Sequence, residues 1–184
     1  MKKYLILVLI VLLIGALTVG VLAGKTGPAG KSNIAHLYLY EKYPQAPGFV
    51  GDWPEVPGGA WGKMKDNQSG ETFDFVFNGH DLEPGQEYCL IYFEDPEANP
   101  WTTLPNIFCL GMGTANGGGE VNIAGSVVIG MDLPTINDKN YPGGAKIWLV
   151  LSDNCNNEDW GIWANGWSPT EYLFEGELIT FTQE

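Results

Sequence analysis

Three tryptophans stand close together near the C-terminal end of the chain, where no alternating pattern would bury them regularly. Trp160, Trp163 and Trp167 fall within eight residues, among small and polar neighbours. Indole rings on a loop can stack on sugar faces or anchor another protein, and Trp is enriched at binding hot spots. Large aromatic side chains also close the ends of small hydrophobic cores. The sequence leaves both interpretations open for this cluster.

An Asp- and Asn-rich stretch just before the tryptophans carries ligand types that suit calcium. Asp153, Asn156, Glu158 and Asp159 supply hard oxygen atoms within seven residues. Ca²⁺ takes about six to eight such ligands. The spacing is not that of an EF-hand, because Cys155 occupies a ligand position and no central Gly is present. Calcium is therefore the one cofactor that the sequence suggests, and the alternative is a solvated Asx-rich turn.

The three cysteines cannot all pair within one chain. Cys89 and Cys109 fall on successive expected strands and can sit opposite one another, whereas Cys155 follows a third strand. We expect a disulfide between Cys109 and Cys155, because a bond between non-neighbouring strands restrains more of the chain. Cys89 then packs as a small buried hydrophobe. The absence of any disulfide remains an alternative.

The residues that commonly carry hydrolytic chemistry are sparse. With His36 and His80 as its two histidines, the sequence has no His pair at metal-ligand spacing and no Gly-x-Ser-x-Gly motif. A glycosidase would need two carboxylates across a cleft. Glu175 and Glu177 are close in sequence, but nothing in the sequence places them in a groove. We therefore expect a protein that is not an enzyme, with no catalytic residues.

The N-terminus indicates export. Residues 4–23 carry no charge and follow Lys2 and Lys3. The run is as long as the roughly 20 residues that span a membrane, yet Val21-Leu22-Ala23 suits signal-peptidase cleavage. A cleaved signal peptide and a retained membrane anchor both remain open for residues 1–23. Either one places the rest outside, so we expect an extracellular or cell-surface protein.

Composition narrows the range of partners. Residues 24–184 carry all 22 Asp and Glu but only seven of the nine Lys, which gives a net charge of −15. Nucleic acid and anionic lipid surfaces would be repelled by such a chain. Membrane contact is expected only through residues 4–23, if they are retained. Asn67 begins an Asn-x-Ser tripeptide, a glycosylation acceptor pattern that suits an exported domain.

The folded part reads as one β domain. Residues 24–33 are small, polar and rich in Gly and Pro, which predicts a linker, and residues 34–184 form the expected domain. Period-two alternation between turn-forming clusters predicts strands. The expected strands are residues 34–40, 60–65, 71–78, 87–93, 106–114, 120–128, 145–151 and 173–182.

These strands predict an all-β, antiparallel two-sheet sandwich, immunoglobulin-like or related to a jelly roll, preceded by the N-terminal hydrophobic helix. No interval has the helical periodicity that parallel crossovers need. Residues 116–119 are rich in Gly, and we expect them to close a hairpin between strands 109–114 and 120–128. Residues 168–171 predict one short helix, with Pro169 at its first position.

Several segments resemble uncharacterised exported β-sandwich proteins found mainly in archaea. The resemblance rests on residues 75–88, 109–116, 123–126, 146–150 and 169–175. It implies a secreted or surface β-sandwich and carries no activity and no site residues.

The sequence thus predicts a structural or binding module outside the cell that contacts another protein or copies of itself. The rival hypothesis is a carbohydrate-binding module that uses Trp160, Trp163 and Trp167. A secreted enzyme acting on glycosides ranks third.

Overall fold

The computed structural model of the chain describes residues 32–44, 53–95, 106–138, 143–155, 160–162 and 168–184. The chain divides into two compact units, Met1–Ser32 and Asn33–Glu184. The expected leader at residues 1–23 and most of the expected linker lie outside the described residues. Within the described ranges, no helix has the length and apolar character needed to cross a membrane.

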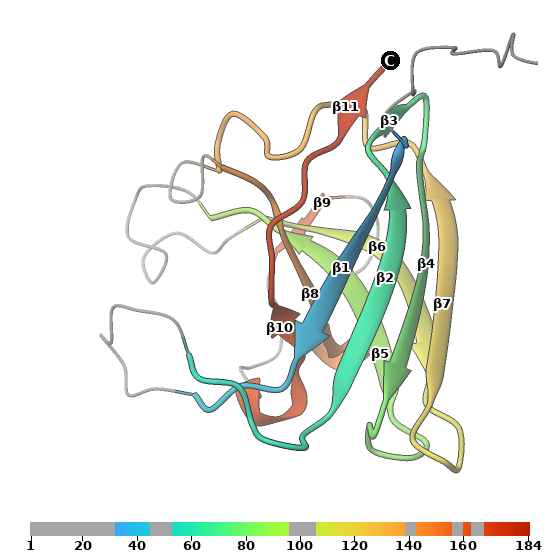
Figure 1. Ribbon diagram of the computed structural model, residues 1–184, viewed down its shortest axis with the longest axis vertical. Helices are drawn as coiled ribbons and strands as arrows, with labels where there is room; N and C mark the ends of the chain where they lie inside the picture. Colours follow the sequence, from blue (N-terminus) through green and yellow to red (C-terminus); the bar gives the residue numbers. More distant parts are fainter. Residues whose placement is uncertain (1–31, 45–52, 96–105, 139–142, 156–159, 163–167) are drawn as a thin grey trace, which may run out of the picture. The chain divides into compact units, whose positions relative to one another are not determined.

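One layer of the domain is a five-stranded antiparallel sheet (Figure 1). Its spatial order is β10-β1-β2-β4-β7, and every neighbouring pair is antiparallel. The strands are β1 (Ile34–Tyr40), β2 (Trp61–Asn67), β4 (Phe73–His80), β7 (Val121–Val127) and β10 (Phe174–Glu175).

A four-stranded antiparallel sheet, in the order β8-β5-β6-β9, forms the second layer. Its strands are β5 (Glu87–Phe93), β6 (Asn106–Thr114), β8 (Lys146–Leu151) and β9 (Trp160–Ile162). A small parallel pair joins β3 (Ser69–Gly70) to β11 (Thr182–Gln183). Two single-turn 3₁₀ helices complete the described elements, η1 (Ser152–Asn154) and η2 (Pro169–Glu171). The expected short helix with Pro169 at its start is therefore present.

The main core lies between the two sheets. Strand β4 alternates strictly, and Phe73, Phe75 and Phe77 all point inward while their neighbours are exposed. From β5, Tyr88, Leu90 and Tyr92 belong to the same buried cluster. Because alternating side chains of a strand point to opposite faces, this pattern predicts that β4 belongs to a sheet with one buried face and one solvent-exposed face.

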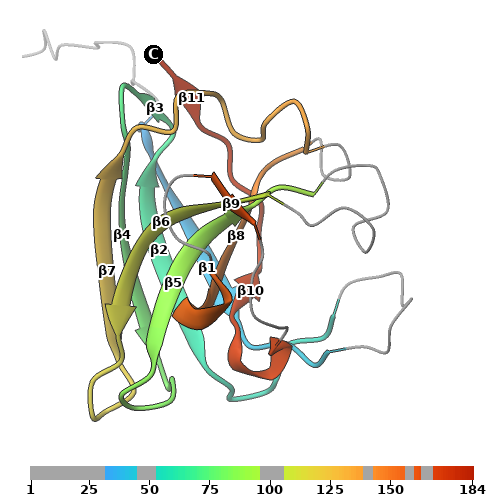
Figure 2. The ribbon, with the colours of Figure 1, turned by 180° about the vertical axis from the view of Figure 1, so that it is seen from behind.

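A second apolar layer covers the far face of the four-stranded sheet. Residues 88–93 of β5 are all buried, so this strand has no wet face. The outward residues Cys89, Ile91 and Phe93 pack with side chains of β8 and of the C-terminal segment. Those partners are Trp148, Val150, Cys155, Tyr172 and Phe174. Figure 2 shows the ribbon from this side, with β5 and β6 in front. The near-continuous apolar run of β5 therefore reflects burial on both sides.

The expected hairpin at residues 116–119 is wrong. Strand β6 pairs with β5 and β9, whereas β7 pairs with β4, so this turn crosses from one sheet to the other. The turn bonds to the neighbouring crossover instead, because Leu82 N–H donates to Gly119 O and Ala115 N–H donates to Gln86 O, both at 2.9 Å. Gly119 has a φ of 76°, and a Cβ there would lie 2.6 Å from Leu82 O. Glycine is thus required for contact between the turns.

The predicted fold class is confirmed at the level of an antiparallel, almost purely β structure in two layers. The finer choice between an immunoglobulin-like and a jelly-roll-related sandwich stays a prediction, and the expected N-terminal helix falls outside the described residues.

A first prediction concerns the column of phenylalanines. Phe77 is 0% exposed, and its ring packs so closely on β2 that a Cβ at Gly62 would lie 2.3 Å from it. We expect Phe77→Ala to lower the free energy of unfolding by about 3–5 kcal/mol in urea titrations. Val76→Ala is the matched control, since Val76 is 43% exposed on the other face. Equal effects of the two changes would contradict the assignment of faces.

The buried carboxyl of Asp66 gives a second prediction. Asp66 is 1% exposed on the inward face of β2, and neither carboxylate oxygen has a hydrogen-bond partner in the described structure. Burial raises its pKa to about 6. Because the folded-state pKa lies above the unfolded value of about 3.9, this group favours folding at low pH, and that contribution is lost as the pH rises through 6.

We therefore expect Asp66→Asn to be more stable than the wild type at pH 7, by about 3 kcal/mol, with the difference shrinking towards pH 4. Urea unfolding of both proteins at pH 4, 5, 6 and 7 measures it. A difference that does not change with pH would show that Asp66 does not titrate in this range.

Candidate functional site

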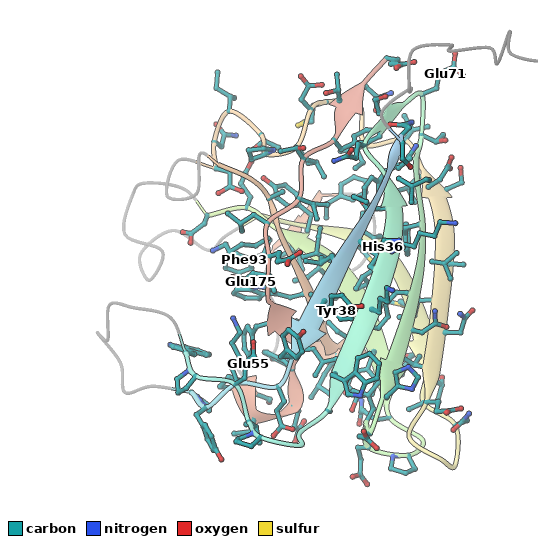
Figure 3. The ribbon with its side chains drawn as sticks, viewed as in Figure 1. His36, Tyr38, Glu55, Glu71, Phe93 and Glu175 are labelled. Atoms are coloured by element: carbon teal, nitrogen blue, oxygen red, sulfur yellow. The ribbon has the colours of Figure 1, made fainter. Side chains whose placement is uncertain are left out.

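The outer face of the five-stranded sheet is the most distinctive surface in the described part of the chain. Its side chains come from alternate positions of β1, β2, β4 and β7. Aromatic, cationic and amide-bearing ones gather there, beside the exposed Ile34, Asp74 and Val76. Figure 3 shows His36 and Tyr38 on this face, in front of the sheet. Together we call Tyr38, Tyr40, Trp61, Lys63, Lys65, Asn78, His80, His36 and Asn122 the aromatic face.

Strand pairing lines up its aromatic rings. Tyr40 lies opposite Trp61, and Trp61 lies opposite His80, so one row crosses β1, β2 and β4. Since neighbouring strands are about 4.8 Å apart, the row spans roughly 10 Å. The Trp61 and His80 rings stack with centroids 4.5 Å apart, and Tyr38 stacks near Tyr40 at 6.3 Å. All four rings are half-buried.

Cations gather beside the rings. Lys63 lies opposite Tyr38, and its Nζ is 5.3 Å from the centre of that ring. Lys65 lies opposite His36, one row further along the face, and both are exposed. In contrast, Lys42 donates to the Glu175 carbonyl at 2.6 Å and Lys146 forms a buried ion pair with Asp95. Lys63 and Lys65 therefore place two positive charges beside the rings, in a chain with a net charge of −13.

Hydrogen-bonding groups complete the face. Asn122 Nδ2 donates to Asn78 Oδ1 at 2.8 Å, which orients two amides from neighbouring strands. Glu55 and Glu177 lie near the Tyr40 end. Partial burial raises the pKa of Tyr40, and the negative charge of Glu55 adds to the shift. The face thus holds donors and acceptors on both sides of its rings.

A cavity of about 300 Å³ lies at one end of the sandwich. Trp61 begins β2 and His80 ends β4 at this end. Its walls include Glu41, Asp81, Glu83 and Glu171, together with the buried Tyr88. Ala60 and Asp81, next to Trp61 and His80 in the chain, also line it. The cavity is therefore acidic and polar, and two of its lining residues are sequence neighbours of Trp61 and His80.

The carboxyl groups with raised pKa lie elsewhere, and two of the three have hydrogen-bond partners. Burial raises the pKa of Asp138 to about 6, although Tyr92 Oη donates to its Oδ2 at 3.0 Å. Burial also raises the pKa of Glu175, whose carboxylate accepts a hydrogen bond from Trp148 Nε1. Figure 3 shows Glu175 beside Phe93, at the side of the second apolar layer. Neither carboxyl lines the cavity.

The structure does not describe the side chains of the three tryptophans that the sequence analysis selected. Trp160 begins β9, which pairs with β6 through Phe108, but its side chain lies outside what the structure describes. Trp163 and Trp167 lie outside the described residues altogether. Another tryptophan, Trp148 of β8, is buried. The expected role of Trp160, Trp163 and Trp167 in binding stays a prediction.

The expected calcium ligands are likewise only partly visible. Asp153 lies in η1, whereas Asn156, Glu158 and Asp159 fall outside the described residues. Within the described part of the chain, no group of three or more His, Cys, Asp and Glu side chains is arranged to hold a metal ion. The calcium site therefore remains a prediction from the sequence.

The expected disulfide between Cys109 and Cys155 is wrong for this structure, in which all three cysteines are free thiols. Cys109 instead lies next to Cys89, with the two sulfur atoms 2.8 Å apart. The reason is the direct pairing of β5 with β6, in which Cys89 lies opposite Met112 and Cys109 lies opposite Ile91, on either side of a shift in register.

The aromatic face was not identified from the sequence, although its residues other than His80 were within expected strands. The expected strand 71–78 ended two residues before His80, which the structure places in β4. Tyr38 and Tyr40 alternate with the buried Leu37 and Leu39, so their outward direction was available from the pattern. What the sequence does not contain is the strand order β1-β2-β4, which places Tyr40, Trp61 and His80 in one row.

Comparisons with models of protein families, with curated proteins and with solved structures found no match. The class that the fold and the site define is an antiparallel two-layer β protein with one sheet face left open and lined by aromatic, cationic and amide side chains.

Asn67 is expected to have a structural role. Its Nδ2 donates to Thr72 O at 2.8 Å, and its Oδ1 accepts from Asp74 N–H at 2.8 Å, so the side chain holds the turn before β4. We expect Asn67→Ala to cost about 1–2 kcal/mol of unfolding free energy in urea titrations. A glycan on Nδ2 would disturb the same bonds, so mass spectrometry of protein from a glycosylating host should find Asn67 unmodified. A fully glycosylated, equally stable protein would contradict this role.

Proposed function

We propose that this protein is a non-catalytic binding module that works outside the cell and that its aromatic face binds glycans. The observation that carries the proposal is the row of Tyr40, Trp61 and His80 across three paired strands. This surface takes the place of the loop tryptophans in the carbohydrate-binding hypothesis.

The rings supply the apolar part of the contact. Tyr and Trp present an apolar body with a polar edge, which suits a ligand that has both C–H surfaces and hydroxyl groups. Their backbone positions are fixed by sheet pairing, so little order has to be imposed when a ligand binds. A flat sheet with half-buried rings fits an extended chain of sugar units better than a single small molecule.

The polar side chains supply direction. The paired amides of Asn78 and Asn122 and the amino groups of Lys63 and Lys65 offer donors beside the rings. Glu55 and Glu177 offer acceptors near Tyr40. A hydroxyl both donates and accepts hydrogen bonds, so a surface with both kinds of group matches a polyol.

The proposal that the module is not an enzyme rests on where the carboxyl groups lie. A glycosidase uses a general acid with a raised pKa beside the scissile bond. The carboxyls with raised pKa, Asp66, Asp138 and Glu175, do not line the cavity.

Export, and a retained or cleaved leader at residues 1–23, are part of the same proposal. They rest on the uncharged run behind Lys2 and Lys3. We also propose that the finer architecture is immunoglobulin-like or jelly-roll-related, which the two antiparallel layers support. Outside the cell, polysaccharides and glycosylated surfaces are abundant ligands, whereas the acidic composition disfavours nucleic acid.

The test is glycan-array binding by the full chain, followed by titration of the best glycan. We expect Trp61→Ala to weaken binding about ten-fold or more, because a stacked ring contributes on the order of 1 kcal/mol beyond the area it buries. Tyr43→Ala is the matched control, since Tyr43 is 50% exposed and lies beyond the end of β1. It should leave binding unchanged.

Two outcomes would overturn the proposal. Binding that survives Trp61→Ala and is lost in Trp160→Ala and Trp163→Ala would move the site to the C-terminal loops. Concentration-dependent self-association in sedimentation, without binding to any glycan, would favour the protein-contact hypothesis instead.

A further inference from the structure

The three cysteines, which are far apart in sequence, meet on the far face of the four-stranded sheet, the side seen in Figure 2. Cys89 comes from β5, Cys109 from β6 and Cys155 from the residue after η1. All three belong to or pack against the second apolar layer. This cluster is on the opposite sheet from the aromatic face, so it is independent of the proposed function.

An irregularity in strand pairing brings two of the sulfur atoms together. Leu90 pairs with Gly111 and Ile91 pairs with Cys109, so Leu110 is an extra residue on β6. Such a bulge increases the local twist and changes where neighbouring side chains point. Cys89 and Cys109 are diagonal neighbours across it, and their Sγ atoms are 2.8 Å apart. A disulfide bond of about 2.05 Å needs only a small further approach.

The two thiols have unequal surroundings. Cys89 is 0% exposed, whereas Cys109 is half-buried at the edge of the apolar layer. A hydrogen bond from Cys89 lowers the pKa of Cys109, and the Gly111 backbone N–H acts in the same direction. The same contact with Cys109 raises the pKa of Cys89. Reactive cysteines combine a lowered pKa with access to solvent, and buried ones are inert until a partner reaches them.

We propose that Cys89 and Cys109 are an oxidisable dithiol, in which Cys109 reacts first with an external disulfide and Cys89 then closes an intramolecular disulfide. The external oxidant is a disulfide of a small thiol or of another protein. The arrangement assigns distinct roles to two neighbouring thiols, with Cys109 as the attacking thiol and Cys89 as the resolving thiol.

The chemistry balances in two exchanges. The Cys109 thiolate attacks one sulfur of the external disulfide, which forms a mixed disulfide and releases one thiolate of the oxidant. Cys89 then loses its proton and attacks Cys109 Sγ, which forms the Cys89–Cys109 bond and releases the second thiolate. The two released thiolates take up the two protons that the protein thiols lost. The protein is oxidised by two electrons, and the external disulfide is reduced to two thiols.

Cys155 is left as the third thiol. Cys89 also interacts with Cys155, so this residue is the competing partner for the resolving step. The proposal requires Cys155 to remain a free thiol after oxidation. Since Cys155 is buried, it should also react more slowly than Cys109 with external reagents.

Peptide mapping of the full chain distinguishes the pairings, because cleavage after Lys separates Cys155 from the other two cysteines. No Lys or Arg lies between Lys65 and Lys139, so cleavage after Lys leaves Cys89 and Cys109 together in peptide 66–139 and Cys155 in peptide 147–184. The protein is incubated with oxidised glutathione, blocked with N-ethylmaleimide at low pH, digested and weighed. We expect an unlinked peptide 66–139 that is two hydrogens lighter and unblocked, and a peptide 147–184 that is blocked once.

Two variants test the order of attack. Cys89→Ser should accumulate a mixed disulfide with glutathione on Cys109, because the resolving thiol is gone. Cys109→Ser should form an adduct at least about ten-fold more slowly, because the accessible thiolate is gone. Cys155→Ser is the matched control and should close the disulfide like the wild type. Far-UV circular dichroism checks that each variant folds, and the mapping of the wild type does not depend on any variant.

Peptide 66–139 linked to peptide 147–184 would overturn the proposal, since it would show that Cys155 takes part in the bond. A wild-type protein that keeps three free thiols in oxidised glutathione would also overturn it. In either case the binding of glycans to the aromatic face would be unaffected.

Discussion

Burial of strand β5 on both of its faces is the constraint on which the rest of this structure depends. Tyr88, Leu90 and Tyr92 face the five-stranded sheet, and Cys89, Ile91 and Phe93 face the second apolar layer. The chain after β8 must therefore return over the far side of the four-stranded sheet, where Tyr172 and Phe174 cover it. Among the described residues, no such segment covers the outer face of the five-stranded sheet.

The two faces of the five-stranded sheet therefore have different roles, since the inner face stabilises the fold and the outer face is available for binding. The inward residues of β4 pack into the core, while its outward residues, Asn78 and His80 among them, are free to carry a binding surface. The same strand thus serves both purposes through its alternation. In the opposite sheet, β5 and β8 are buried on both faces, and Lys146 of β8 is paired with Asp95.

Sequence patterns located most of the strands but not their partners. They missed β9, and the expected strand at residues 173–182 is interrupted, with β10 at residues 174–175 and β11 at 182–183. Strands at residues 34–40, 87–93 and 106–114 were predicted with the bounds that the structure has, because alternation and turn residues mark them clearly. The hairpin at 116–119 was wrong, since a Gly-rich turn fits a crossover between sheets equally well. The row of Tyr40, Trp61 and His80 and the approach of Cys89 to Cys109 both arise from pairing and a bulge, which are long-range properties.

The contact between the two crossovers has a practical consequence for engineering. Backbone hydrogen bonds hold residues 82–86 against residues 115–119, and within the tip Asn116 Oδ1 accepts from Gly118 N–H and Glu120 N–H. A Cβ at Gly117 would meet nothing within 4 Å. Loop tips of this kind tolerate inserted sequence. The position between Gly117 and Gly118 is accordingly a suitable place to graft a peptide tag or a displayed epitope onto this scaffold.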